Sequence, residues 1–151
     1  MRILLAALTL VAATISPAWA ENFDDPAALI EFAYSQYTPD SMSGFDLRAH
    51  ASQDLLALFE ADEARTPDGE IGALEFDPMV NGQDFDLGDL AVVETERTDA
   101  RALVTASFTN MGTLQELQFT LVATADGWAI DDIESVEPGF EWKLTDILGA
   151  E

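Results

Sequence analysis

The stretch FDPMVNGQDF, at residues 76–85, gathers side chains of the kinds that bind cations or line reactive loops. Four of them carry oxygen donors: Asp77, Asn81, Gln83 and Asp84. Ca²⁺ is coordinated by roughly six to eight such oxygens. Counted from Asp77, however, an EF-hand would need ligands at the third and twelfth positions, where Met79 and Gly88 stand. A cation site would therefore rest on the density of donors alone, and we expect no bound metal.

The same residue types also form tight turns that hold no ligand. An Asp before Pro78 accepts bonds from nearby backbone N–H groups, and Asn81-Gly82 tolerates positive φ. Gln83 and Asp84 can bond to backbone groups that such a loop exposes. We expect this structural role for the stretch, as a corner between helices and sheet.

Acid–base catalysis is the other chemistry that the residues allow. Tyr34, Tyr37 and His50 are the candidates, because a histidine or carboxylate beside a tyrosine can move a proton. His50 is the single histidine of the chain, and a single titratable group makes no catalytic constellation. The absence of Cys excludes thiol catalysis and thiolate zinc sites, and no phosphate-binding loop or nucleophile elbow occurs. We expect no catalytic residue and no cofactor.

The N-terminus indicates export. Residues 1–20 carry one Arg, an apolar run from Ile3 to Ile15, and an Ala-Trp-Ala cleavage site. This is the pattern of a secretory signal peptide, and the run is too short for a membrane span. Without Cys it is not a lipoprotein signal. We expect a soluble bacterial periplasmic or secreted chain, with a single domain at residues 21–151.

The charge of the chain is strongly acidic, with 29 Asp and Glu against 6 Lys and Arg, a net charge of −23. Removal of Arg2 with the signal peptide brings the net charge to about −24. Nucleic acids and anionic membranes are bound through clusters of basic residues, so we expect neither as a partner after signal cleavage. Two explanations stay open: a highly solvated surface suited to a salty exterior, and attraction of a basic partner.

Two helices are predicted in the first half of the chain. Asp25 can cap the first and Pro26 suits its first position, and Thr38-Pro39 ends it. The second starts near Ser52, with an apolar side that includes Phe59 and an exposed end at residues 61–65.

From Leu90 onward, apolar and polar residues alternate as in strands. Turn signals at residues 110–113 and 125–128 separate runs that predict four antiparallel strands. A short helix is expected within residues 140–151. Helices followed by such strands predict an α+β fold, with N-terminal helices packed on a curved four-stranded meander sheet.

Three segments together resemble a known family: SQDLLALFEADEA at 52–64, FDPMVNGQDFDLGDL at 76–90 and DGWAIDDIES at 126–135. They look like the bacterial domain of unknown function family 3828, over about residues 24–148. That family resembles the nuclear-transport-factor-2-like, cystatin-like cone fold. The resemblance implies the fold and no activity, because function does not follow from such a superfold.

These features favour a non-enzymatic exported domain that binds a small apolar ligand or serves a structural role. One alternative is an acidic protein-binding module, of an inhibitor or immunity type, that covers a basic protein. Another is a cone-fold lyase or isomerase, which the fold resemblance allows and which would need a base beside a tyrosine in an open cavity.

Overall fold

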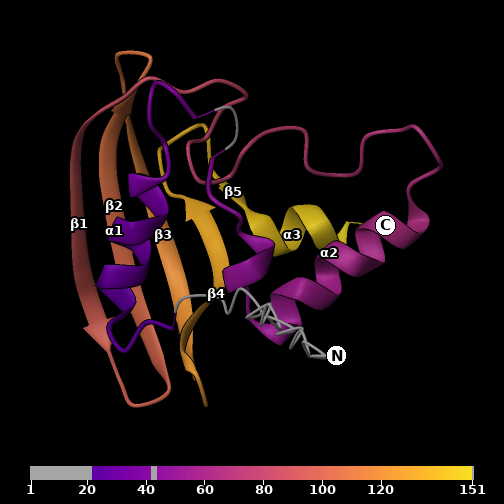
Figure 1. The fold of residues 1–151 in the computed structure, drawn as a ribbon. Helices are drawn as coiled ribbons and strands as arrows, with labels where there is room; N and C mark the ends of the chain where they lie inside the picture. The colour runs from indigo at the N-terminus through magenta and orange to yellow at the C-terminus, as the bar shows by residue number, and fades with distance from the viewer. Residues whose placement is uncertain (1–21, 42–43, 151) are drawn as a thin grey trace, which may run out of the picture.

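The computed structural model describes residues 22–41 and 44–150, which build an antiparallel sheet with helices against it (Figure 1). The elements in chain order are α1 (Pro26–Ser35), the 3-10 helix η1 (Arg48–His50), α2 (Gln53–Arg65), β1 (Leu87–Arg97), β2 (Arg101–Asn110), β3 (Thr113–Thr124), β4 (Gly127–Ser135), β5 (Trp142–Lys143) and α3 (Leu144–Gly149). The predicted signal peptide at residues 1–20 lies outside the described residues. Across residues 22–41 and 44–150, no helix is long and apolar enough to cross a membrane.

Both predicted helix starts are confirmed by their caps. Asp25 Oδ1 accepts a hydrogen bond from the Ala28 N–H at 3.0 Å, and Ser52 Oγ accepts one from the Leu55 N–H at 3.1 Å. The prediction of an exposed end for α2 is wrong at Asp62, which is only 9% exposed. Its carboxylate accepts a bond from the Ala73 N–H at 3.1 Å, because the loop after α2 folds back over the helix.

The fold is α+β as predicted, but the sheet has five strands in the order β1-β2-β3-β4-β5 and not four. The additional strand, Trp142–Lys143, pairs with Glu134 and Ser135 at the end of β4. Two paired residues are too few to show an alternating pattern, so this part of the sequence predicts only the helix that follows. That helix is present as α3.

The alternation predicted for the strands is confirmed in β2. Ala102, Val104, Ala106 and Phe108 are buried, while the residues between them are half-buried. The turn that joins β2 to β3 places Met111 at φ 50° and Gly112 at φ 78°, a conformation that glycine adopts at little cost. The inner face of the sheet thus meets α1, and α2 and α3 pack beside β4 (Figure 1).

A bulge in β4 fixes the helices beside it. Thr120 pairs with Asp132 and Leu121 with Ile130, so Asp131 is an extra residue on this strand. Asp131 Oδ1 accepts the hydroxyl of Ser52 at 2.7 Å, at the start of α2. Asp132 accepts both the N–H and the hydroxyl of Thr145, at 3.1 and 2.8 Å, at the start of α3. One local irregularity therefore anchors two helix starts.

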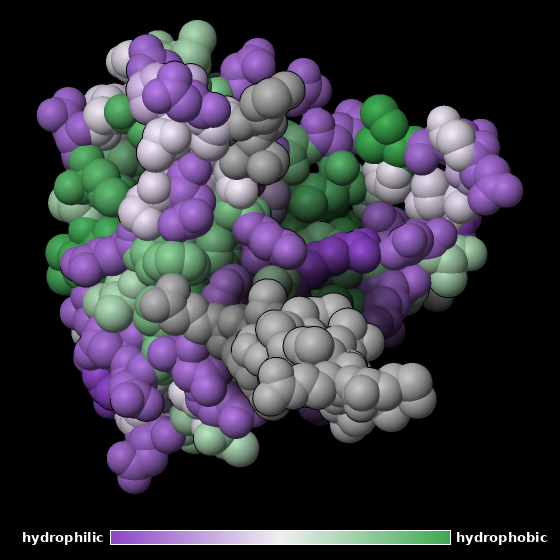
Figure 2. Space-filling model, viewed as in Figure 1, coloured by the Kyte–Doolittle hydropathy of each residue, from purple (hydrophilic) through white to green (hydrophobic). Residues whose placement is uncertain are grey.

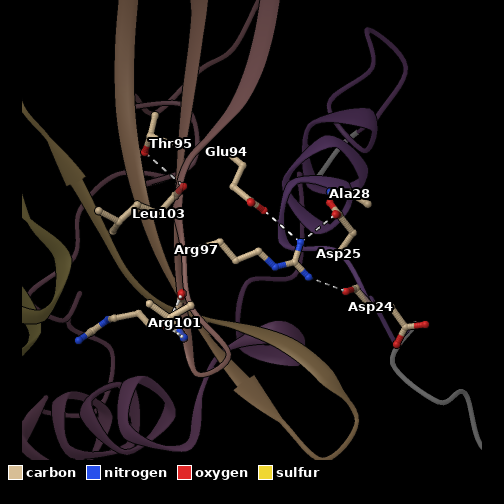
Figure 3. A network of polar contacts seen from close by, with 9 residues as sticks. Asp24, Asp25, Ala28, Glu94, Thr95, Arg97, Arg101 and Leu103 are labelled. Carbon is tan, nitrogen blue, oxygen red and sulfur yellow. Dashed lines mark hydrogen bonds and ion pairs between the residues drawn. The ribbon is translucent and has the colours of Figure 1, made fainter.

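Arg97, the last residue of β1, links the sheet to the start of α1 (Figure 3). Its Nη1 lies 3.2 Å from Asp25 Oδ2 and 3.3 Å from Glu94 Oε2, and its Nη2 donates to the Asp24 carbonyl at 3.4 Å. The guanidinium carbon also lies 5.2 Å from the centre of the Trp128 ring, within the range of a cation–π contact. On the face of the molecule seen in Figure 2, side chains are largely hydrophilic, with apolar ones exposed over β1.

Candidate functional site

The loop at residues 76–85 lies at the end of the sheet that carries the β2–β3 hairpin, and it contacts β3 and β5 there (Figure 1). The Asp77 N–H donates to the Gly82 carbonyl at 2.9 Å, and the two residues form an isolated antiparallel bridge. Asn81 takes φ 51° within the turn. Met79 and Val80 are fully buried and fix the turn to the core. This is the closed corner expected from the Asp-Pro and Asn-Gly pairs.

Both candidate tyrosines bond to the turn, Tyr37 to Asp77 and Tyr34 to Met79. Tyr37 donates its phenolic hydrogen to Asp77 Oδ2 at 2.6 Å, and Asp77 Oδ1 accepts the Met79 N–H at 2.9 Å. Tyr34 donates to the Met79 carbonyl at 2.9 Å. Tyr34 lies in the last turn of α1 and Tyr37 just after it, so these bonds join the end of the helix to a loop some 40 positions further along the chain.

Burial dominates the electrostatics of this group. It raises the pKa of the Asp77 carboxyl, while the hydrogen bonds from Tyr37 and the Met79 N–H lower it and offset part of the rise. Burial likewise raises the pKa of Tyr37, and the bond that its hydroxyl donates to Asp77 raises it further. The pKa of Tyr34 is raised by burial first, then by the nearby Tyr37 and Asp77. Both phenols therefore remain protonated donors at neutral pH.

The space around the tyrosines is filled by aromatic side chains. The Tyr34 ring lies 5.1 Å from Phe108 and 6.2 Å from Phe119, both of which are fully buried. The Tyr37 ring lies 5.1 Å from Phe85 in an edge-on arrangement. Both oxygens of Asp77 are already bonded, so a proton transfer there would first have to break a bond to Tyr37 or to the backbone.

His50, the third candidate for proton transfer, lies in a different aromatic cluster. Its ring stacks on Phe45 at 4.9 Å and meets Phe23 and Phe32 edge-on at 5.9 Å. The structure thus gathers Tyr34, Tyr37 and Asp77 at the turn and places His50, in η1, against the rings of Phe23, Phe32 and Phe45.

Asn81 connects the turn to two other elements. Its Nδ2 donates to Gln115 Oε1 at 2.7 Å, on β3, and its Oδ1 accepts the Trp142 indole N–H at 2.8 Å, on β5. Gln83 plays a lesser part, since among the described residues its amide donates only to the Glu75 carbonyl, at 3.3 Å and in an exposed position.

Asp84 does not hold the loop through its carboxylate, contrary to our expectation. Its side chain is exposed and makes no hydrogen bond to any of the described residues, and only its carbonyl is used. That carbonyl and the one of Val80 accept the Asn110 amide, at 3.1 and 3.0 Å, and Asn110 Oδ1 accepts the Asp86 N–H at 2.9 Å. Asn110 is 6% exposed. The sequence shows it only as the residue before a Met-Gly turn, which does not reveal this role.

An open cleft of about 450 Å³ lies beside Asn81. Side chains from three separate segments line it: Asn81, Thr113, Gln115, Glu137, Phe140, Glu141 and Trp142. Trp142 packs edge-on against Phe76 at 5.1 Å, which fixes its ring, while Phe140 is 71% exposed. We call this hollow the Trp142 cleft. Ligand sites of this size combine apolar walls with a few directed polar groups, as this one does.

No family model, curated protein or solved structure matches the chain. The resemblance to family 3828 therefore remains a prediction from the sequence.

The Trp142 cleft presents three kinds of group to a molecule that enters it. It offers aromatic faces, amide groups and carboxylates. Within residues 22–41 and 44–150, no group of three or more His, Asp or Glu side chains is placed to hold a metal ion. The side-chain oxygens of the loop diverge: Asp77 Oδ2 accepts the Tyr37 hydroxyl, Asn81 Oδ1 accepts the Trp142 indole N–H, and the Asp84 side chain is exposed.

Proposed function

We propose that this chain is an exported, non-enzymatic binding domain of the cone-fold type that holds a small ligand in the Trp142 cleft. The observation that carries the proposal is the convergence of Phe140 and Trp142 with the amides of Asn81 and Gln115 around one open hollow. Two ring faces supply apolar contact area, and the amides can orient a bound molecule.

The interior of the fold supports a site at this end and not between α1 and the sheet. Tyr34, Phe108 and Phe119 are in ring contact there, and none is more than 3% exposed. A lyase or isomerase would need its base to face substrate, whereas both oxygens of Asp77 are engaged by Tyr37 and Met79. This arrangement favours binding over catalysis.

The experiment is a ligand-observed NMR screen of a small-molecule panel against the processed chain. Phe140→Ala should abolish most hits without loss of folding, because that side chain is largely exposed. Leu114→Ala is the matched control: it removes another exposed apolar side chain, 67% exposed, that is not among those lining the cleft. The proposal is overturned if the panel compounds bind Phe140→Ala and Leu114→Ala equally well. It is also overturned if no compound binds the parent or the control.

Export is tested separately by N-terminal sequencing of the protein recovered from the periplasmic or secreted fraction. We expect the chain to begin at Glu21, after the Ala-Trp-Ala site. Recovery of an unprocessed chain in the cytoplasm would contradict export and would leave the binding test unaffected.

The acidic protein-binding module is the second candidate, and the net charge of −23 is the observation that favours it. A basic partner would be retained on the immobilised processed chain at low salt and released as the ionic strength rises. Retention that is insensitive to salt would argue against this candidate.

A further inference from the structure

The lining of the Trp142 cleft is acidic as well as aromatic. Glu137 and Glu141 lie on either side of Phe140 in sequence, and both line the cleft. None of the described residues that line it is basic. Any charged ligand that enters it will therefore meet negative charge, with aromatic rings and amides as the remaining walls.

Local hydrogen bonds fix the segment that carries these groups. The Phe140 N–H donates to the Glu137 carbonyl at 3.0 Å, which closes a turn, and Gly139 takes φ 90° within it. Glu141 Oε2 accepts the Gly139 N–H at 3.0 Å. Beyond the turn, Trp142 is held by β5 pairing and by its bond to Asn81. The backbone of the segment, the Glu141 carboxylate and the Trp142 ring are thus held in place.

Within residues 22–41 and 44–150, no Lys or Arg lines this cleft. Each Lys and Arg among the described residues lies 3.0–3.2 Å from a carboxylate elsewhere. Lys143 is the nearest of them in sequence, and its Nζ lies 3.1 Å from Asp132 Oδ2 on β4. Glu137 and Glu141 therefore have no basic side chain of the described residues beside them in the cleft, which leaves their charge available to a ligand.

We propose that the Trp142 cleft selects small organic cations, such as alkylated ammonium compounds, over neutral molecules of the same shape. A cation above an aromatic face is attracted by the ring quadrupole, and Trp and Phe rings are available here. Alkyl groups around the nitrogen bury apolar surface against Phe140 and Trp142, while the charge lies near the two carboxylates. This inference rests on the proposed binding function and adds the class of ligand.

Trp142 supplies the signal for the test. The processed chain retains two tryptophans, Trp128 and Trp142, because Trp19 belongs to the predicted signal peptide. In a Trp128→Phe background, fluorescence reports on the cleft alone. The probes are choline and its uncharged isostere, in which a quaternary carbon replaces the nitrogen.

We expect choline to bind at least about tenfold more tightly than the isostere, and the difference to shrink as salt is added. Glu137→Gln combined with Glu141→Gln should weaken choline binding by about tenfold. The control combines Glu31→Gln with Glu60→Gln, which removes the same charge from exposed positions on α1 and α2, and should change binding by less than about twofold.

The outcomes separate the two proposals. Equal binding of choline and the isostere would overturn the selectivity for cations and keep the cleft as a binding site. An equal loss in the cleft variant and the control would show an effect of net charge only and would also overturn this inference. If neither probe binds and the small-molecule panel also fails, the proposed function falls with it; if the panel binds and choline does not, only this inference falls.

Discussion

Tyr37 donates a 2.6 Å hydrogen bond to Asp77 and thereby joins the segment after α1 to the turn at residues 77–82. The carboxyl of Asp77 is desolvated, and the bonds from Tyr37 and the Met79 N–H only partly offset that cost. The turn is therefore held by a carboxylate whose ionisation opposes folding.

The first prediction concerns the pH dependence of stability. Because folding raises the Asp77 pKa, the folded state holds its proton more tightly than the unfolded state does. The contribution of Asp77 to stability is complete below the unfolded pKa, near 3.8, and is lost as pH rises through the raised folded pKa. Asp77→Asn should remove this loss, because the amide can still accept the Met79 N–H and bond to the Tyr37 hydroxyl.

The measurement is urea unfolding of the parent and of Asp77→Asn, each at pH 3.5 and at pH 7. The quantity compared is the difference in unfolding free energy between the two proteins at each pH. The gain in unfolding free energy from Asp77→Asn should be larger at pH 7 than at pH 3.5. Asp84→Asn, which removes a charge from the same loop at an exposed site, is the control for self-repulsion in so acidic a chain. A pH effect of equal size in both variants would refute the role given to Asp77.

The second prediction is that Asn110, and not Asp84, holds the loop at residues 76–85. Asn110→Ala removes two bonds donated to the carbonyls of Val80 and Asp84, and one accepted from the Asp86 N–H. It should cost about 2 kcal/mol, or roughly 6–10 °C in Tm, because buried backbone groups are left without partners. Asp84→Ala should cost less than about 0.5 kcal/mol, since it removes an exposed side chain. A larger loss for Asp84→Ala than for Asn110→Ala, seen by thermal unfolding, would reverse this assignment.

The third prediction concerns the attachment of α3 to the sheet. Asp132 accepts the backbone and hydroxyl groups of Thr145 and pairs with Lys143, so Asp132→Ala should cost about 1–3 kcal/mol. Hydrogen exchange should accelerate most at the amides of residues 144–149. Asp146→Ala removes an exposed acid from the first turn of the same helix and should leave that exchange nearly unchanged. Uniform acceleration over the whole chain in Asp132→Ala would contradict a local anchor.

Signals that lie within a few residues of one another allowed much of the fold to be predicted. Asp25-Pro26 and Ser52 mark helix starts through caps that reach only three residues ahead. The alternation in residues 102–108 marks a strand with one buried face. Such patterns act through local backbone geometry, and for this reason the helices and the four long strands are visible in sequence.

The candidate site depends on contacts between residues far apart in sequence, which no local pattern records. Asn81 was a candidate from its Asn-Gly pair, but its bond to Trp142 joins positions 61 residues apart. Glu137, Phe140 and Glu141 belong to no recognisable sequence motif. The cleft exists only because the segment at 137–142 turns back to pair with β4 and meets the loop at residues 76–85.

The fourth prediction compares two glycines with positive φ. Gly112 takes φ 78° in a hairpin, and no atom beyond its chain neighbours lies within 4 Å of the place that a β-carbon would occupy there. Gly112→Ala therefore adds only backbone strain, about 1 kcal/mol. Gly127 takes φ 115°, and a β-carbon there would lie 2.4 Å from the Phe23 carbonyl oxygen. That oxygen accepts the Trp128 N–H at 2.9 Å, which fastens the segment before α1 to β4.

Gly127→Ala should therefore cost at least about 1 kcal/mol more than Gly112→Ala in urea unfolding, because Phe23 must move and its bond to Trp128 is weakened. The displaced segment should also become a better substrate for chymotrypsin at Phe23, whereas Gly112→Ala should leave that cleavage unchanged. Equal costs for the two variants, with no change in cleavage at Phe23, would show that the contact between Phe23 and β4 adds little to stability. A larger cost for Gly127→Ala, together with faster cleavage, would instead show that Phe23 stabilises the fold through its contact with β4. Glycine would then be required at position 127, because any β-carbon there displaces Phe23.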